Sequence, residues 1–281
     1  MFIEPATAIA VGEELYNRRN ELARAFSGLW YFITRGKLRI VVFGAGGSGK
    51  TTFGKLMSEK FDQEISSPHY TESRSMESYK NVKGVPLAEV IVPPGQDWRR
   101  DIYWQELYEI LRESRSVGVV NIVSWGYHAF EDHSYKETQY YRKLREHTNK
   151  EISKEQFLSE FLKRGREEDI VIIKELTPRL IDIKKDFWMV TLVTKQDLWW
   201  KERVEVHKHY TEGEYHTYIT NITNHRRAPR FKHEYLSASL AMNNFTTPSG
   251  EIMIPVSEGY DQNIQKTHLR LLFKTIEDFG G

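Results

Sequence analysis

Apolar residues at helical spacing mark the two ends of the chain. Residues 6–34 carry one apolar stripe, with charged residues around the rest of the helix: Leu15, Leu22, Phe26, Leu29 and Ile33. Residues 262–279 carry a second: Ile264, Leu269, Leu272, Phe273 and Ile276. We therefore predict an N-terminal amphipathic helix within residues 1–36 and a closing helix near 262–279. Two uses of the first helix stay open: packing on its own domain, or docking on a partner protein or a membrane surface.

Short runs of β-branched and apolar residues between these helices predict strands. The densest run, Leu38–Phe43, passes directly into glycines and then into a helix that begins near Lys50. Helix-like stretches separate four further candidates: 87–92, 117–124, 187–193 and 234–240. This alternation predicts an α/β fold with a mostly parallel sheet and helices on both faces.

Residues 125–168 are a charged stretch rich in Tyr, His, Lys and Glu. The stretch is longer than a simple connection between a strand and a helix. We expect a helical insertion there, inside a single domain that spans residues 37–281.

Composition narrows the classes of function. Forty basic and thirty-nine acidic residues leave a net charge of +1, which provides no broad field to attract nucleic acid. The absence of cysteine excludes disulfides, thiolate metal sites and a cysteine nucleophile. The N-terminus lacks the pattern of a secretory signal, and no apolar run approaches the roughly 20 residues of a membrane-spanning helix. We expect a cytoplasmic protein without a transmembrane segment.

A phosphate-binding loop is the strongest motif in the chain. The segment Gly44-Ala45-Gly46-Gly47-Ser48-Gly49-Lys50-Thr51 fits the pattern G-x-x-x-x-G-K-[ST] between a strand and a helix. Glycines let successive backbone N–H groups surround phosphates. We expect Lys50 to reach the β- and γ-phosphates, and the Thr51 hydroxyl to bind Mg²⁺. The predicted nucleotide contacts run from Gly44 to Thr52.

The phosphate loop does not choose between ATP and GTP, so the base must be recognised elsewhere. The predicted strand 187–193 is followed by Thr194-Lys195-Gln196-Asp197. An aspartate at the carboxyl edge of the sheet can accept hydrogen bonds from N1 and the 2-amino group of guanine, whereas adenine offers no such pair of donors. The Lys195 stem would pack along the base. Asp197 therefore favours a guanine nucleotide, although an aspartate that caps a helix in a surface turn has the same pattern.

In these two motifs the chain resembles the Ras-like and translation-factor-related GTPases, which read guanine with [NT]-K-x-D. Ser237-Ala238-Ser239 is similar to the Ser-Ala-Lys loop of that family, whose backbone amide meets the guanine carbonyl. Ser239 stands where the family has lysine. The motifs follow one another in the order of the family, and the resemblance covers the chain from about Lys37 to its end.

The switch motifs of the family are matched less well. Pro93-Pro94-Gly95-Gln96 resembles part of the switch II motif D-x-x-G-Q, but Val92 occupies the position of its aspartate. The resemblance implies that Gly95 meets the γ-phosphate and that Gln96 orients the attacking water. In the polar stretch 66–75, Thr71 resembles the switch I threonine that contacts Mg²⁺ and the γ-phosphate.

The resemblance implies a GTP-binding molecular switch. Such a protein binds GTP or GDP with Mg²⁺, hydrolyses GTP, and signals to a protein effector or regulator through its switch loops or N-terminal helix. Because Val92 replaces a carboxylate that supports Mg²⁺, slow hydrolysis is expected.

Other functions stay open on the sequence alone. Arg226, Arg227 and Arg230 could clamp a transferred phosphate, as in a P-loop small-molecule kinase or ATPase. Val92 would also suit a nucleotide-binding scaffold without hydrolysis. Five histidines crowd residues 207–233, but their spacing suits no defined metal site.

Overall fold

The structure is a computed structural model that describes residues 38–57, 75–79, 89–94, 97–114, 116–130, 134–225 and 230–280. The predicted N-terminal helix in residues 1–36 lies outside these ranges. No helix in the described ranges combines the length and apolar character needed to cross a bilayer.

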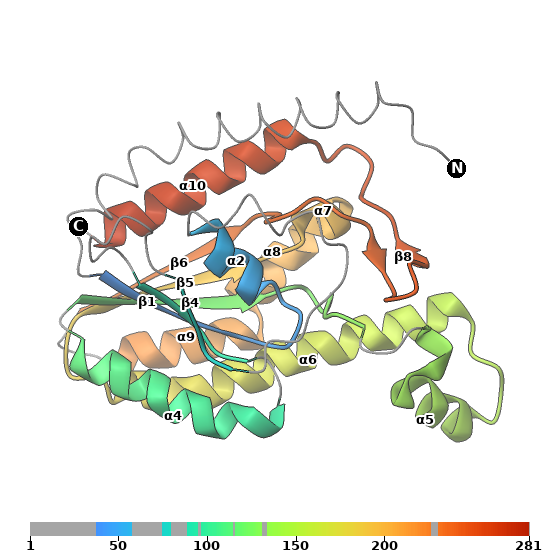
Figure 1. The fold of residues 1–281 in the computed structure, drawn as a ribbon, viewed down its shortest axis with the longest axis horizontal. Coiled ribbons are helices and arrows are strands. Elements are labelled where there is room, and N and C mark those ends of the chain that lie inside the picture. The colour runs from blue at the N-terminus through green and yellow to red at the C-terminus, as the bar shows by residue number, and fades with distance from the viewer. Residues whose placement is uncertain are drawn as a thin grey trace.

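A six-stranded sheet forms the centre of the molecule (Figure 1). Its strands lie in the order β2-β3-β1-β4-β5-β6, and every neighbouring pair is parallel except β2 and β3. The strands are β1 (Leu38–Gly44), β2 (Glu77–Tyr79), β3 (Glu89–Val92), β4 (Ser116–Val123), β5 (Phe187–Val193) and β6 (Phe231–Ser237). This topology confirms the predicted α/β fold with a mostly parallel sheet.

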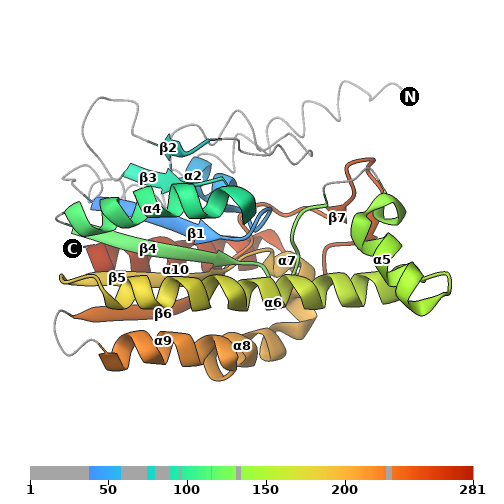
Figure 2. The ribbon, with the colours of Figure 1, turned by 90° about the horizontal axis from the view of Figure 1, so that it is seen from below.

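Helices cover both faces of the sheet, as predicted (Figures 1 and 2). One face carries α2 (Lys50–Leu56) and α10 (Gln262–Gly280). The other carries α4 (Asp97–Glu113), α6 (Lys154–Ile181), α8 (Arg203–Glu212) and α9 (Glu214–His225). α10 is the closing helix that the sequence predicts.

Alternation along the strands creates two cores, one on each face of the sheet. In β1, Ile40 and Val42 face the core under α2 and α10, while Val41 and Phe43 face the core under α4 and α6. All seven residues of β5 are buried, because that strand lies between two neighbours and between two helical layers.

The predicted last strand, 234–240, begins and ends too late. Strand β6 runs from Phe231 to Ser237. It is an edge strand whose side chains are alternately half-buried and exposed over its first half, with Lys232 and Glu234 pointing to solvent. Its polar positions break the apolar run on which the prediction depended.

Residues 125–168 are largely helical, which agrees with the predicted insertion. They contain η1 (Tyr135–Glu137), α5 (Gln139–Thr148) and the first half of α6. Ser153 and Gln156 start α6 with a capping box, each side chain bonding the backbone N–H of the other. The division of the chain into domains stays a prediction.

A two-stranded hairpin follows β6. It pairs β7 (Phe245–Thr246) with β8 (Ile252–Ile254) in antiparallel fashion, and it lies at the same end of the molecule as α5 (Figures 1 and 2). Lys154 of α6 holds the hairpin there, because its Nζ donates to the Ile252 carbonyl at 2.7 Å.

The topology also fixes where a ligand can bind. Strands β1, β4, β5 and β6 are parallel, so the loops after them meet at one edge of the sheet. These loops contain the phosphate-loop motif, residues 124–130, the Thr194–Asp197 motif and Ser237–Ser239.

Candidate functional site

The phosphate loop connects β1 to α2, and its glycines are required by geometry. Gly44 and Gly47 have φ values of +139° and +70°, which L side chains rarely adopt. There is also no room for a side chain: a Cβ at Gly44 would collide with the Ile122 carbonyl oxygen, and a Cβ at Gly47 with the Ala129 backbone nitrogen. The loop after β4 therefore packs directly on the phosphate loop.

Lys50 lies inside this loop. Its side chain is buried, and Nζ donates to the carbonyl oxygens of Gly44 at 2.8 Å and Ala45 at 2.6 Å. The ammonium group is thus held against the loop that the motif assigns to phosphate.

Ser48 adds an independent indication of a ligand. Its side chain is fully buried, yet its Oγ has no hydrogen-bond partner within the described part of the chain. Buried hydroxyls are rarely left without a partner, and such exceptions often face a missing ligand or water. A buried cation and an orphaned hydroxyl in the same loop suit an anionic ligand.

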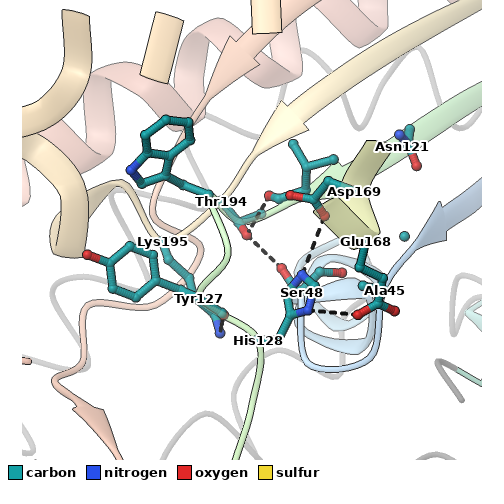
Figure 3. A network of polar contacts seen from close by, with 12 residues as sticks. Ala45, Ser48, Asn121, Tyr127, His128, Glu168, Asp169, Thr194 and Lys195 are labelled. Carbon is teal, nitrogen blue, oxygen red and sulfur yellow. Dashed lines mark hydrogen bonds and ion pairs between the residues drawn. The ribbon is translucent and has the colours of Figure 1, made fainter. Parts of the chain in front are cut away.

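The Thr194 hydroxyl connects the phosphate loop to the motif after β5. Its Oγ1 lies 2.6 Å from the Ser48 carbonyl oxygen and 3.1 Å from that of Val123 (Figure 3). The Thr194 backbone N–H also donates to Val123 at 2.8 Å. Thr194 thus contacts both the end of β4 and the phosphate loop, and it connects the following turn to that loop.

Lys195 occupies the turn in a left-handed conformation, with φ of +57°. Its Nζ donates to the carbonyl oxygen of Tyr127 and lies 5.5 Å from the centre of the Phe245 ring. Burial lowers the pKa of Lys195 to about 8, although Asp197 and Asp169 oppose the shift.

Asp197 is nearly inaccessible, and its carboxylate is already bonded on both oxygens. Oδ1 accepts from the Ser239 hydroxyl at 2.7 Å, and Oδ2 accepts from the Asn243 backbone N–H at 3.1 Å. Burial raises the pKa of Asp197 above its ordinary value, against these hydrogen bonds and the charge of Lys195. A carboxylate has about four acceptor positions, so Asp197 keeps capacity to accept from a further donor.

The structure assigns different contacts to the two serines of Ser237-Ala238-Ser239. Ser239 is fully buried and is the residue that donates to Asp197. Ser237 instead accepts from Gln196 Nε2 at 2.8 Å, and Ala238 N–H donates to the Val193 carbonyl. Their predicted contacts with a nucleotide remain predictions.

A cavity of about 230 Å³ joins the phosphate loop to the Asp197 turn. Of the predicted site residues that the structure describes, six line it: Gly47, Ser48, Gly49, Thr52, Lys195 and Asp197. The rest of the lining comes from three other places, the loop after β4, the residues around Leu198 and the segment after β6: Ala129, Phe130, Thr194, Leu198, Leu240, Ala241, Asn243, Asn244, Phe245, Thr246, Thr247 and Pro248.

The segment after β6 is a part of the site that the sequence analysis misses. It contributes most of one wall of the cavity, including Phe245. The only sequence signal is a single aromatic residue between polar ones, Asn243-Asn244-Phe245-Thr246-Thr247, which does not by itself indicate binding.

A buried ion-pair network around His128 is a second feature that the sequence analysis misses (Figure 3). His128 Nδ1 lies 3.1 Å from a Glu168 oxygen, and Nε2 lies 3.4 Å from Oδ1 of Asp169. The other oxygen of Asp169 accepts from the Tyr210 hydroxyl at 2.9 Å. Burial alone would lower the pKa of His128, but the hydrogen bonds to Asp169 and Glu168 outweigh it and raise the pKa to about 9.

This network fastens the loop after β4 to α6. A protonated His128 is paired with carboxylates of α6, and the next residue, Ala129, packs on Gly47 of the phosphate loop. The sequence gives no sign of it, because 41 residues separate His128 from Asp169.

Several predicted site residues lie outside the described ranges: Thr71, Gly95, Gln96, Arg226 and Arg227. Val92, at the predicted switch II position, is fully buried at the end of β3 and brings no carboxylate. Arg230 directly precedes β6, so it lies at the edge of the sheet opposite the phosphate loop. This position removes Arg230 from the candidate site.

No three histidine, aspartate or glutamate side chains gather to hold a metal ion in the part of the chain that the structure describes. The five histidines are distributed over α8, α9 and β6. One of them, His233, is half-buried, and its Nε2 lies 2.9 Å from the Thr191 hydroxyl. Thr51, the predicted Mg²⁺ ligand, lies in the first turn of α2.

The fold and this site define an α/β protein with a phosphate loop at the end of its central strand β1. No protein-family model and no curated protein matches the chain. Among solved structures the chain is similar to a dimerization-deficient mutant of Toc33 from Arabidopsis thaliana, with 9% identity over 93% of this chain and 91% of that chain and a TM-score of 0.44.

Two further solved structures are similar to this chain. One is the Arl6 BBS3 small GTPase from Trypanosoma brucei with a bound nucleotide analogue, with 14% identity over 88% of this chain and 100% of that chain and a TM-score of 0.40. The other is the mammalian SRP receptor, with 17% identity over 73% of this chain and 92% of that chain and a TM-score of 0.37. At these scores the fold class rests on the strand order given above.

Proposed function

We propose that the protein binds GTP and GDP in this cavity and acts as a GTP-binding switch. One observation carries the proposal: a single cavity is lined by the phosphate loop at one end and by Asp197 at the other. The Thr194 hydroxyl fixes the distance between the two parts. The arrangement suits a ligand with an anionic tail and a base that donates two hydrogen bonds.

The residues of the candidate site divide the proposed function among them. The amides of Gly47, Ser48 and Gly49 and the Lys50 ammonium bind the phosphate tail, and Asp197 accepts from the guanine edge. The Thr51 hydroxyl suits Mg²⁺, which would neutralise charge on the β- and γ-phosphates when bound. Val92 supplies no carboxylate near that ion, so we expect weak metal support and slow hydrolysis. Thr71, Gly95 and Gln96 keep their predicted switch roles, toward an effector that recognises the GTP-bound form.

Guanine selectivity tests the proposal. The affinities for GTP and ATP are measured on the wild type, on Asp197→Asn and on the control Asp186→Asn, in the presence of Mg²⁺. Asp186 directly precedes β5, whereas Asp197 follows it, so the two aspartates lie at opposite edges of the sheet. There Asp186 accepts a hydrogen bond from the Arg230 N–H at 2.7 Å. We expect the wild type and Asp186→Asn to prefer GTP, and Asp197→Asn to lose at least about tenfold of that preference. Equal affinities for GTP and ATP in the wild type would overturn the guanine assignment.

The phosphate end is tested separately. Lys50→Ala removes the buried ammonium, and we expect it to abolish binding of either nucleotide. Mass spectrometry of the nucleotide that copurifies with the wild type identifies the ligand directly. A wild-type protein that retains no nucleotide and behaves like Lys50→Ala would contradict nucleotide binding altogether.

A nucleotide-binding protein without hydrolysis is the second candidate. The buried Val92 favours it, because this residue brings no carboxylate to the position of the switch II aspartate. Single-turnover measurements with GTP separate the two candidates. Mg²⁺-dependent formation of GDP that is lost in Gln96→Ala supports the slow GTPase, and a GTP complex that persists unchanged supports the scaffold.

A further inference from the structure

The segment between β6 and α10 contacts the Asp197 turn at both of its ends. At the start of this segment, the Ser239 hydroxyl and the Asn243 N–H donate hydrogen bonds to the Asp197 carboxylate. At its end, the Ser257 N–H donates to the Asp197 carbonyl at 2.7 Å, and the Ser257 hydroxyl donates to the Leu198 carbonyl at 2.8 Å. Residues 239–257 are therefore attached to the Asp197 turn at both ends.

Hydrogen bonds also fix the interior of residues 239–257. The β7–β8 hairpin pairs Phe245 with Ile254, and Asn244 Oδ1 accepts from the Val256 N–H at 2.9 Å. Lys154 holds the far strand to α6 through the Ile252 carbonyl. Because the hairpin is fixed on both sides, the position of Phe245 relative to Asp197 is set by the fold.

Phe245 lies in the cavity wall and contacts other aromatic residues. Its ring centre is 4.7 Å from that of Phe130 and 5.4 Å from that of Tyr127. Phe161 stacks on Phe130, with ring centres 4.7 Å apart, and its ring centre lies 6.2 Å from that of Phe245, but it does not line the cavity. These contacts hold the Phe245 ring in one orientation.

The two aromatic residues of the cavity wall lie side by side but are attached to different parts of the site. Phe130 follows Ala129, which packs on Gly47 of the phosphate loop. Phe245 follows Asn243 by two residues, and the Asn243 N–H bonds the Asp197 carboxylate. The Lys195 Nζ of the same turn lies 5.5 Å from the centre of the Phe245 ring. Phe245 is therefore the aromatic residue whose segment is attached to the Asp197 turn.

We propose that Phe245 is the residue that contacts the face of the purine base, while Asp197 reads its edge. The proposal rests on the function proposed above, since it requires a nucleotide whose base lies at the Asp197 end. Phe245 then sets the affinity for purine nucleosides, and Asp197 sets the choice of guanine. Aromatic contact is tolerant of the kind of base, because every base has a π-face.

The test compares two identical substitutions in one aromatic cluster. Phe245→Leu removes the ring in the cavity wall, and Phe161→Leu removes a ring of the same cluster outside the cavity. Phe245→Tyr keeps the ring. The probes are GDP, GTP and inorganic tripolyphosphate, which has the phosphate tail without the base.

We expect Phe245→Leu to bind GDP and GTP roughly tenfold more weakly and tripolyphosphate as tightly as the wild type. Phe161→Leu and Phe245→Tyr should keep wild-type affinity for all three probes. Retained binding of tripolyphosphate shows that the Phe245→Leu protein is folded.

Three results would overturn the role of Phe245. The first is wild-type affinity for GDP and GTP in Phe245→Leu. The second is an equal loss in Phe161→Leu, which would indicate a structural effect of the cluster. The third is a parallel loss for tripolyphosphate. Each of these leaves the wild-type preference for GTP intact, whereas a wild type without any nucleotide affinity removes both the proposed function and this inference.

Discussion

The Thr194 Oγ1 lies 2.6 Å from the carbonyl oxygen of Ser48, which is 146 residues away in sequence. This hydrogen bond directly connects the phosphate loop to the turn that carries Asp197. Both residues are buried, so the bond is made in a low-dielectric environment, and an unpaired Ser48 carbonyl there would be unfavourable. Besides the pairing of β1, β4 and β5, the Thr194 hydroxyl therefore contributes to the relative position of the phosphate end and the base end of the cavity.

Replacing Thr194 by valine tests this dependence. Valine keeps the shape of the side chain but leaves the Ser48 carbonyl without its donor, which costs about 1–2 kcal/mol. We expect GTP affinity to fall by roughly tenfold, because the turn that carries Asp197 is held less firmly to the phosphate loop. The affinity for tripolyphosphate, which has no base, should change little. Isothermal titration measures both. Thr194→Ser retains the hydroxyl and should bind like the wild type, and a normal GTP affinity in Thr194→Val would contradict the role assigned to the bond.

Gly47→Ala tests the close packing between the phosphate loop and the loop after β4. The new Cβ would meet the backbone of Ala129, which ion pairs of His128 hold in place. We expect nucleotide affinity to fall by more than about tenfold, because the phosphate loop must change shape.

Gly250→Ala is the matched control for Gly47→Ala. Gly250 also has a positive φ, +87°, but nothing lies within 4 Å of the position of its Cβ. It should lose roughly 1 kcal/mol of stability from backbone strain and keep its nucleotide affinity. Equal affinities in the two variants would show that the contact with Ala129 is unimportant.

The His128 network predicts a pH-dependent stability. Its pKa is about 9 in the folded protein and about 6.5 when unfolded. Because the folded value is raised, the stabilisation is fully present below pH 6.5 and is lost as the pH rises through 9. The shift corresponds to roughly 3 kcal/mol.

Urea unfolding between pH 6 and 10 measures this contribution. The stability of the wild type relative to His128→Gln should be largest at pH 6 and should shrink toward pH 10. His225→Gln, at an exposed position at the end of α9, should show no such pH-dependent difference from the wild type. Parallel curves for the wild type and His128→Gln would exclude a protonated His128.

The sequence predicts the features that short segments determine. The β1 strand and the phosphate loop are recognisable because a run of apolar residues passes directly into a glycine-rich motif. The backbone of this loop has positive φ values, which favour glycine. The parallel sheet follows from nearly continuous apolar strands such as β5, which is buried along its whole length. The bounds of β6 could not be predicted as well, since at an edge strand exposed polar residues such as Lys232 and Glu234 interrupt the apolar pattern.

The missed parts of the site depend on contacts between distant segments. Phe245 becomes a wall residue only because Asp197 holds residues 239–257 at both ends. The assignment of Ser239 to Asp197 likewise depends on where β6 ends, which a four-residue motif does not specify. Such relationships are properties of the fold and leave no local pattern in the chain.

Acidic pH should weaken guanine selectivity. Burial raises the pKa of Asp197, so on acidification this carboxyl is protonated earlier than an ordinary aspartate. Protonation stabilises the ligand-free fold, because the folded pKa lies above the unfolded one, but it removes an acceptor for the guanine N–H groups. The ratio of GTP to ATP affinity isolates this effect, since the two triphosphate tails titrate alike. We expect the ratio to fall as the pH is lowered from 7 in the wild type and to stay constant in Asp197→Asn. A constant ratio in the wild type would mean that the Asp197 carboxylate does not read the base.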